Sequence, residues 1–300
     1  MSLKSKDLFL KSPIKWAGGK SKLMKKIEVI YNEDFIWNSE KYTYIEPFCG
    51  GGSSWLFVLQ KYHPKRIIIN DINPNVINLW KCIQNNPKKL CEILDNMISD
   101  YLILNWDERK DYFLNLRIAF NNNKHILIES DMDIRMAAEF LFLNKTCFNG
   151  LWRTNLKGEF NTPFGMPTNL NKEPNIYDRE HIMCLSELIA GVKFVCRDYK
   201  DVIGEDITGD VLVYLDPPYR GTWTDYSKEA FGEKEQIELS YYMKELKDRG
   251  FYVIQSNSKC NDDFFEEYYK EFKIKTLDGV QRNIRPTAER KVQEILIYNV

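Results

Sequence analysis

Short apolar runs alternate with polar loops in the first and last parts of the chain, and five of them have the pattern of buried strands. The five runs are residues 42–45, 66–69, 192–195, 211–215 and 251–254. An unbroken apolar run is typical of a parallel strand that is covered on both faces. Helix-like stretches such as 53–60 and 233–249 lie between these runs. The alternation predicts an α/β fold built on an open sheet.

The middle of the chain has a different pattern. Between residues 81 and 185, apolar positions predict helices at 87–103, 107–121 and 131–143, followed by a turn-rich stretch at 144–167. We expect this segment to be an inserted, mainly helical domain. Residues 1–80 and 186–300 would then form one discontinuous catalytic domain.

Composition adds a local asymmetry of charge. The formal net charge over the 300 residues is -1. Residues 1–80 nevertheless carry 12 Lys and Arg against 7 Asp and Glu, whereas residues 186–300 carry 17 against 22. A second basic cluster consists of Arg282, Arg285, Arg290 and Lys291. A local basic surface is sufficient for phosphate contacts, so the neutral balance does not exclude nucleic acid. The alternative to phosphate contacts is that the N-terminal lysines form the solvated face of a helix.

Several classes of protein are excluded by what the chain lacks. Its apolar runs are far shorter than the roughly 20 residues that span a bilayer. The first residues have no apolar export signal, so we expect a cytoplasmic protein. The seven cysteines include no Cys-x-x-Cys pair and the three histidines are scattered. We therefore expect reduced cysteines and no metal site.

Two of the predicted strands end in loops suited to a nucleoside. Glycines 50–52 follow the first strand and permit unusual dihedral angles and close approach to a ligand. Asp71 follows the second strand, where an acid accepts hydrogen bonds from ribose hydroxyls. The third glycine of the dinucleotide fingerprint is replaced by Trp55, which favours an adenosyl ligand without a pyrophosphate over NAD. The alternative is that glycines 50–52 only form a tight turn and bind no ligand. Residues 17–21 (Ala-Gly-Gly-Lys-Ser) suggest a phosphate loop, but Ile14 stands where such a loop needs its first glycine. The sequence therefore disfavours ATP or GTP hydrolysis.

The sharpest signal is Asp216-Pro217-Pro218-Tyr219, which directly follows the strand at 211–215. The two prolines fix their own dihedral angles and remove two backbone donors, so nearby carbonyls stay available as acceptors. A carboxylate beside such a carbonyl suits an exocyclic amino group, and Tyr219 offers a flat face for a base. A proline-rich turn with a capping Asp is the alternative.

Six stretches, taken in order, resemble the Dam-type DNA adenine-N6 methyltransferases (D12 class, alpha group). They are residues 14–20, 46–52, 71–73, 143–155, 158–165 and 216–219, and the similarity runs from 13 to 298. The resemblance implies a Rossmann-like S-adenosylmethionine-dependent methyltransferase sheet, with an inserted target-recognition domain that carries a β-hairpin. It also implies methyl transfer to the N6 amino group of an adenine flipped out of duplex DNA, with no metal.

The resemblance also implies the site residues. Those at donor-contacting positions are Trp16, Lys20, Glu46, Phe48, Gly50, Gly52, Asp71, Asp198, Tyr199 and Asp216. The catalytic positions are Asp216, Pro217 and Tyr219. The DNA-contacting positions are Lys15, Phe148, Asn149, Leu151, Arg153 and Asn155. Among these, we expect Arg153 to read guanine and Tyr219 to stack on the flipped base.

The expected target contains GATC and the expected state is a monomer. A restriction endonuclease for the same site is a candidate partner, and the sequence leaves open whether one accompanies the protein. Two departures from the family pattern, Phe148 in place of Tyr and Lys145-Thr146-Cys147 in place of Arg-x-Gly, leave the exact target sequence open. Two other functions remain open from the sequence. One is methylation of an amino group in RNA or protein, and the other is a DNA-binding homologue without catalytic activity.

Overall fold

A computed structural model describes residues 9–16, 27–28, 41–129, 132–171, 173–221, 231–283 and 291–299. The chain divides into two compact units. Unit 1 comprises residues 1–19, 50–61 and 73–194, and unit 2 comprises residues 20–49, 62–72 and 195–300.

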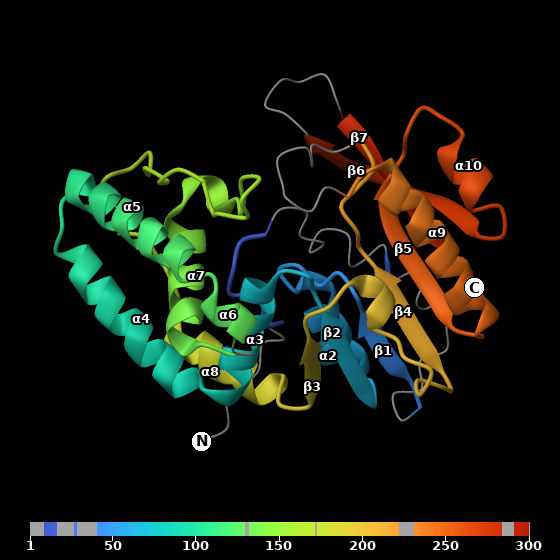
Figure 1. Cartoon of the computed structure of the whole chain (residues 1–300), viewed down its shortest axis with the longest axis horizontal. Helices are drawn as coiled ribbons and strands as arrows, with labels where there is room; N and C mark the ends of the chain where they lie inside the picture. Colours follow the sequence, from blue (N-terminus) through green and yellow to red (C-terminus); the bar gives the residue numbers. More distant parts are fainter. Residues whose placement is uncertain are drawn as a thin grey trace. The chain divides into compact units, whose positions relative to one another are not determined.

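In the described residues, the sheet has seven strands, in the order β3-β2-β1-β4-β5-β7-β6 (Figure 1). Its strands are β1 (Thr43–Glu46), β2 (Arg66–Asn70), β3 (Val192–Val195), β4 (Val211–Leu215), β5 (Tyr252–Ser258), β6 (Lys273–Asn283) and β7 (Lys291–Tyr298). β1 pairs in parallel with β2 and β4, and β4 pairs in parallel with β5. β7 runs antiparallel to both β5 and β6. The predicted α/β class with a Rossmann-like sheet is therefore confirmed.

The strand order reverses between β1 and β4, because β2 lies on one side of β1 whereas β4 and β5 lie on the other. Loops from the carboxyl ends of strands diverge at such a switch point, and ligands of open α/β sheets bind there. The loop after β1 begins at Pro47 and the loop after β4 begins at Asp216. The topology thus brings two of the predicted site loops to the same point of unit 2.

Unit 2 has an apolar core between one face of the sheet and the helices α9 (Glu233–Asp248) and α10 (Phe264–Tyr268). Leu239 and Met243 of α9 and Phe265 of α10 pack with the fully buried Val213 and Ile297. Every residue of β4 is buried, which explains why this strand reads as an unbroken apolar run.

Unit 1 is mainly helical. Its helices are α2 (Ser53–Tyr62), α3 (Pro74–Asn85), α4 (Pro87–Leu102), α5 (Trp106–Asn122), α6 (Ile126–Glu129), α7 (Ile134–Thr146), α8 (Arg179–Leu188) and the short 3-10 helix η1 (Phe148–Gly150). α7 is buried along almost its whole length and packs against α3, α4 and α5, which flank it in Figure 1. Because it is buried on almost all sides, α7 forms the centre of unit 1.

The three predicted helices of the middle segment are confirmed as α4, α5 and α7. α5 begins at Trp106 because Asn105 and Glu108 form a reciprocal capping box. α7 begins at Ile134, later than expected, because the Asp133 side chain accepts a hydrogen bond from the backbone of Met136 at 2.7 Å. The domain boundaries at 80 and 185 stay a prediction, since the compact unit that contains 81–185 also contains α2 and most of β3.

All seven cysteines are free thiols, as predicted. None of the helices that the structure describes combines the length and the apolar character needed to cross a membrane.

Candidate functional site

The loop after β1 starts from a buried acid. Glu46 is fully buried, and its Oε2 accepts a 2.6 Å hydrogen bond from the Tyr44 hydroxyl on the same strand. Phe48 follows two residues later, and its ring centroid lies 5.1 Å from that of Tyr199. Tyr199 opens the 3-10 helix η2 (Tyr199–Asp201) after β3. The structure therefore brings Phe48 beside Tyr199, two residues that the sequence assigned to one ligand.

Asn70, at the end of β2, connects the loops of three strands. It is 1% exposed, and its Nδ2 donates to the Pro47 carbonyl at 2.8 Å and to the Arg197 carbonyl at 3.0 Å. Its Oδ1 accepts from the Arg197 backbone N–H at 2.9 Å, and its own carbonyl accepts from the Cys49 N–H at 2.9 Å. Asn70 thus fixes the loops that carry Phe48 and Asp198. The sequence analysis missed it, although a polar residue at the end of an apolar strand was a visible signal.

Two predicted carboxylates lie in these loops. Asp71 directly follows Asn70 and is half-buried. Asp198 is also half-buried, and its Oδ1 accepts a 3.0 Å hydrogen bond from the backbone of Lys200, which caps η2. Burial raises the pKa of the Tyr199 hydroxyl, and the Asp198 carboxylate raises it further, so this group stays protonated at neutral pH.

The loop after β4 is held by side chains of β5 and α9. Asp216 Oδ1 accepts a 2.6 Å hydrogen bond from Ser256 Oγ. The Pro218 carbonyl accepts from Gln236 Nε2 at 2.7 Å, and Gln236 Oε1 accepts in turn from Asn257 Nδ2 at 3.1 Å. Asn257 Oδ1 accepts from the N–H of Arg220 at 3.0 Å. The acceptor loop predicted from the prolines is therefore braced on both sides of Tyr219. The Tyr219 side chain is only 9% exposed, so its ring is covered in this structure.

The glycines after β1 are required by neighbouring tryptophans. A Cβ on Gly50 would lie 2.7 Å from Trp16 Nε1, and a Cβ on Gly52 would lie 2.7 Å from Trp80 and 2.8 Å from Trp55. Gly50 and Gly52 also have φ values of +45° and +85°, which side-chain-bearing residues rarely adopt. Trp16 therefore lies beside the predicted donor loop, and Trp55 is a core residue of unit 1 at the start of α2.

The predicted hairpin is present in unit 1, where antiparallel bridges join Cys147 to Phe164 and Thr154 to Phe160. Asn144, which is fully buried, ties the hairpin to Lys15. Its Oδ1 accepts from the Lys15 N–H at 2.8 Å, and its Nδ2 donates to the carbonyls of Lys15 at 2.8 Å and Gly150 at 3.3 Å.

The segment that follows the Cys147–Phe164 bridge of the hairpin carries exposed apolar side chains. Phe148 is 51% exposed and Leu151 is 42% exposed, and Asn149 between them has a φ of +56°. Arg153 Nε donates to Asn161 Oδ1 at 2.8 Å. Asn155 instead builds the turn: its Oδ1 accepts from two backbone N–H groups, and its Nδ2 donates to Glu159 at 2.9 Å.

Some predicted residues lie outside the described part of the chain. They include Lys20, most of the N-terminal lysines, Arg285 and Arg290. The side chains of Arg282 and Lys291, at the facing ends of β6 and β7, are also outside it.

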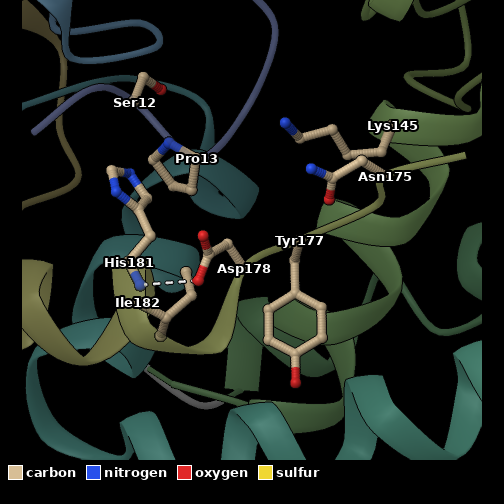
Figure 2. A pocket seen from close by; sticks show the side chains of 8 residues that line it. All are labelled: Ser12, Pro13, Lys145, Asn175, Tyr177, Asp178, His181 and Ile182. Atoms are coloured by element: carbon tan, nitrogen blue, oxygen red, sulfur yellow. Dashed lines mark hydrogen bonds between the residues drawn. The ribbon is translucent and has the colours of Figure 1, made fainter.

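Unit 1 contains a cavity of about 120 Å³ (Figure 2). It is lined by Ser12, Pro13, Lys145, Asn175, Tyr177, Asp178, His181 and Ile182. Burial lowers the pKa of Lys145, and the nearby Lys15 lowers it further. A ligand site for a molecule of drug size has a volume of roughly 300–1,000 Å³, so this cavity is too small for a nucleoside donor.

A family model for the D12 class N6 adenine-specific DNA methyltransferases matches residues 16–283. The chain belongs to this family. It is 36% identical over 294 residues to the type II methyltransferase M.MjaIII of Methanocaldococcus jannaschii, which covers 95% of this chain and 98% of the relative. It is 31% identical to the type II methyltransferase M1.LlaDCHI of Lactococcus lactis subsp. cremoris, over 99% of this chain and 98% of the relative. It is also 31% identical to a DNA adenine methylase of Serratia marcescens, over 94% and 96% of the two chains.

The protein is therefore an adenine-specific DNA methyltransferase that methylates the N6 amino group of adenine. This family match decides between the functions that the sequence left open, in favour of an enzyme that acts on DNA. In this methyltransferase, the loops at the switch point of the sheet are the candidate active site, and the hairpin is the candidate DNA interface.

Proposed function

We propose that the loop after β4 is the catalytic centre, and that Asp216 and the Pro217 carbonyl accept hydrogen bonds from the adenine amino group. This proposal rests on which backbone groups of the loop are hydrogen-bonded within the described part of the protein and which one is not. The Pro218 carbonyl and the Arg220 N–H are bonded to Gln236 and Asn257. The Pro217 carbonyl accepts no hydrogen bond from any residue in the described part of the chain. The neighbours hold the loop while this acceptor stays available.

Two hydrogen-bond acceptors beside the adenine amino group would make its nitrogen a better nucleophile. The lone pair of that nitrogen is conjugated into the ring, which makes it a poor nucleophile. Hydrogen bonds to Asp216 and Pro217 favour a pyramidal nitrogen whose lone pair points away from the ring plane. They also stabilise the positive charge that develops on nitrogen. Such positioning contributes on the order of 7–11 kcal/mol. The nitrogen loses its proton after methyl transfer, so Asp216 need not act as a base in the transition state.

S-adenosylmethionine, which supplies a methyl group bonded to a positively charged sulfur, is the proposed donor. The residues at the carboxyl ends of β1, β2 and β3 fit its adenosyl part. Phe48 and Tyr199 offer aromatic faces, and Asp71 and Asp198 offer carboxylate acceptors for ribose hydroxyls and an adenine amino group. The buried Tyr199 hydroxyl has no hydrogen-bond partner among the described residues, which a polar ligand atom would supply. Trp16, Lys20, Glu46, Gly50, Gly52 and Asp216 complete the proposed donor site.

We propose that the hairpin enters the DNA and that the target adenine is flipped into the catalytic loop. Flipping costs a few kcal/mol, and exposed apolar side chains such as Phe148 and Leu151 can occupy the space that a displaced base leaves. Arg153 is bonded through Nε to Asn161, which leaves its terminal nitrogens for bidentate contact with guanine. Lys15 and Asn149 are proposed to contact DNA beside it. Asn155, with its side chain committed to the turn, supports the hairpin as well as the proposed contact.

Methyl transfer from tritiated S-adenosylmethionine to unmethylated duplex DNA tests the catalytic proposal. Asp216→Ala is expected to abolish transfer while binding of S-adenosylhomocysteine, measured by calorimetry, survives in part. Asp206→Ala, at an exposed acid in a loop of unit 2, is the matched control. Near-normal turnover by the Asp216 variant would show that the catalytic assignment is wrong.

Sequencing of the methylated fragments tests the expectation that the site contains GATC. Arg153→Ala is expected to relax the choice of site, and unchanged selection would exclude its reading role. The type II names of the relatives from M. jannaschii and L. lactis support a restriction endonuclease for the same site as a partner. We also propose that the enzyme acts as a monomer in the cytoplasm, where its DNA substrate lies.

A further inference from the structure

We propose that Ser256 is a positioning residue, which fixes the plane of the Asp216 carboxylate, and that Tyr214 fixes Ser256 in turn. This inference rests on the catalytic role proposed above for Asp216. The terminal torsion of an aspartate side chain is soft, because it is a rotation between tetrahedral and planar carbons with broad minima. A carboxylate that must face an amino group at a defined angle therefore needs an external constraint.

The strand register places that constraint beside the acid. β4 and β5 are parallel neighbours, with Leu215 paired to Gln255, so Asp216 is level with Ser256. Residues two apart share a face of a strand, which puts Tyr214 on the same side as Asp216. Ser256 Oγ lies 2.6 Å from Asp216 Oδ1, and the Tyr214 hydroxyl lies 3.1 Å from Ser256 Oγ.

The direction of these hydrogen bonds follows from the chemistry of the groups. An ionised carboxylate can only accept, so Ser256 must donate its single hydroxyl proton to Asp216. Ser256 then has no proton left for Tyr214, so the Tyr214 hydroxyl must donate to Ser256. The chain therefore runs one way, from Tyr214 through Ser256 to the carboxylate.

The environment makes this chain stiff. Tyr214 is fully buried and Ser256 is 1% exposed, so water does not compete for their hydroxyl groups. The 2.6 Å separation is in the range of charge-assisted bonds between a hydroxyl and a carboxylate, which are shorter and stronger than neutral ones. One carboxylate oxygen is thus held against β5 before the substrate binds.

The test compares Ser256→Ala with Ser240→Ala. Ser240 is also a buried serine of unit 2, but its hydroxyl donates to the Ile237 carbonyl of its own helix at 2.7 Å. The rate constant for methyl transfer is measured in a single turnover, with enzyme in excess over DNA, because product release limits kcat in many enzymes. We expect Ser256→Ala to lower it roughly 10- to 100-fold, with KM for donor and DNA changed less than about threefold. Ser240→Ala should leave it unchanged.

Two further variants separate positioning from a merely structural role. Ser256→Thr keeps the hydroxyl and should restore most of the rate. Tyr214→Phe removes the hydroxyl that donates to Ser256 and should slow the reaction less than Ser256→Ala does. Unfolding midpoints of all variants show whether any loss follows stability instead of the hydroxyl.

The outcomes distinguish this inference from the proposal on which it rests. If Asp216→Ala abolishes transfer but Ser256→Ala keeps the single-turnover rate within about twofold, the positioning role is wrong and the catalytic role stands. The positioning role is also wrong if the whole effect of Ser256→Ala lies in KM, or if Ser240→Ala has the same effect. If Asp216→Ala itself remains active, the catalytic proposal has failed first.

Discussion

Replacement of Asn70 by alanine should destabilise the protein and weaken donor binding together. Asn70 is 1% exposed, and its side chain makes three hydrogen bonds with backbone groups, at 2.8, 2.9 and 3.0 Å. A typical buried hydrogen bond contributes about 1 kcal/mol net. Removing three of them should therefore lower the free energy of unfolding by about 3 kcal/mol. That is a large part of the roughly 5–15 kcal/mol that stabilises a native domain.

The same change should release the loops that carry Phe48 and Asp198. Donor binding must then order these loops again, at about 1–2 kcal/mol for each residue whose backbone is fixed. The dissociation constant for S-adenosylhomocysteine should rise roughly 5- to 30-fold if one residue is freed.

Urea unfolding and titration calorimetry measure the two effects. Asn85→Ala is a suitable control, because Asn85 is exposed and, among the residues that the structure describes, donates only to the Lys81 carbonyl of its own helix. Asn70→Asp keeps the size of the side chain but removes the donor for two carbonyls, so its loss should be at least as large. A change in unfolding free energy below about 1 kcal/mol for Asn70→Ala, with unchanged donor affinity, would refute the reasoning.

Three other predictions concern the hairpin and the thiols. Trp152→Ala removes a ring stacked at 4.1 Å on Phe160, so we expect a loss of about 3 kcal/mol in unfolding free energy and weaker DNA binding by fluorescence anisotropy. Phe148→Ala removes a half-exposed ring, so the urea midpoint should hardly change while DNA methylation slows; a large drop in stability would contradict this. With Ellman's reagent at pH 8, Cys184 and Cys196 should react in the native protein because they are exposed. Cys82 should not react until the protein unfolds, because burial raises the pKa of its thiol to about 12; early modification, found by mass spectrometry, would count against it.

The sequence alone predicted the strands that are buried on both faces, because such burial restricts them to apolar residues. The run at 211–215 matches β4 residue for residue, since a central parallel strand has no solvent face and so no polar positions. β6 and β7 were not predicted. β6 begins Lys273-Ile274-Lys275, an alternating pattern, and it pairs antiparallel with β7 across a register shift between Leu277 and Gln281. The alternation in β6 was a signal of a strand. The sequence did not show that this strand pairs with β7, which comes later in the chain.

The sequence also predicted which loops lie together at the candidate site, because parallel strands place their carboxyl ends at one edge whatever the side chains nearby. Only the tertiary structure showed what holds these loops. Asn70 bonds to Arg197, 127 residues away, and Asn144 bonds to Lys15, 129 residues away. No local pattern predicts such partners, because they depend on how strands and helices are arranged in space.

For the glycines after β1, the sequence supplied one reason for their presence and the tertiary structure supplied another. The sequence predicted unusual dihedral angles and close approach to a ligand there, and Gly50 and Gly52 do have positive φ values. The structure supplied the other reason, since Trp16, Trp55 and Trp80 occupy the space that Cβ atoms would need. Backbone strain is a local property that a sequence can indicate, whereas close packing against distant aromatic rings is decided only when the chain has folded.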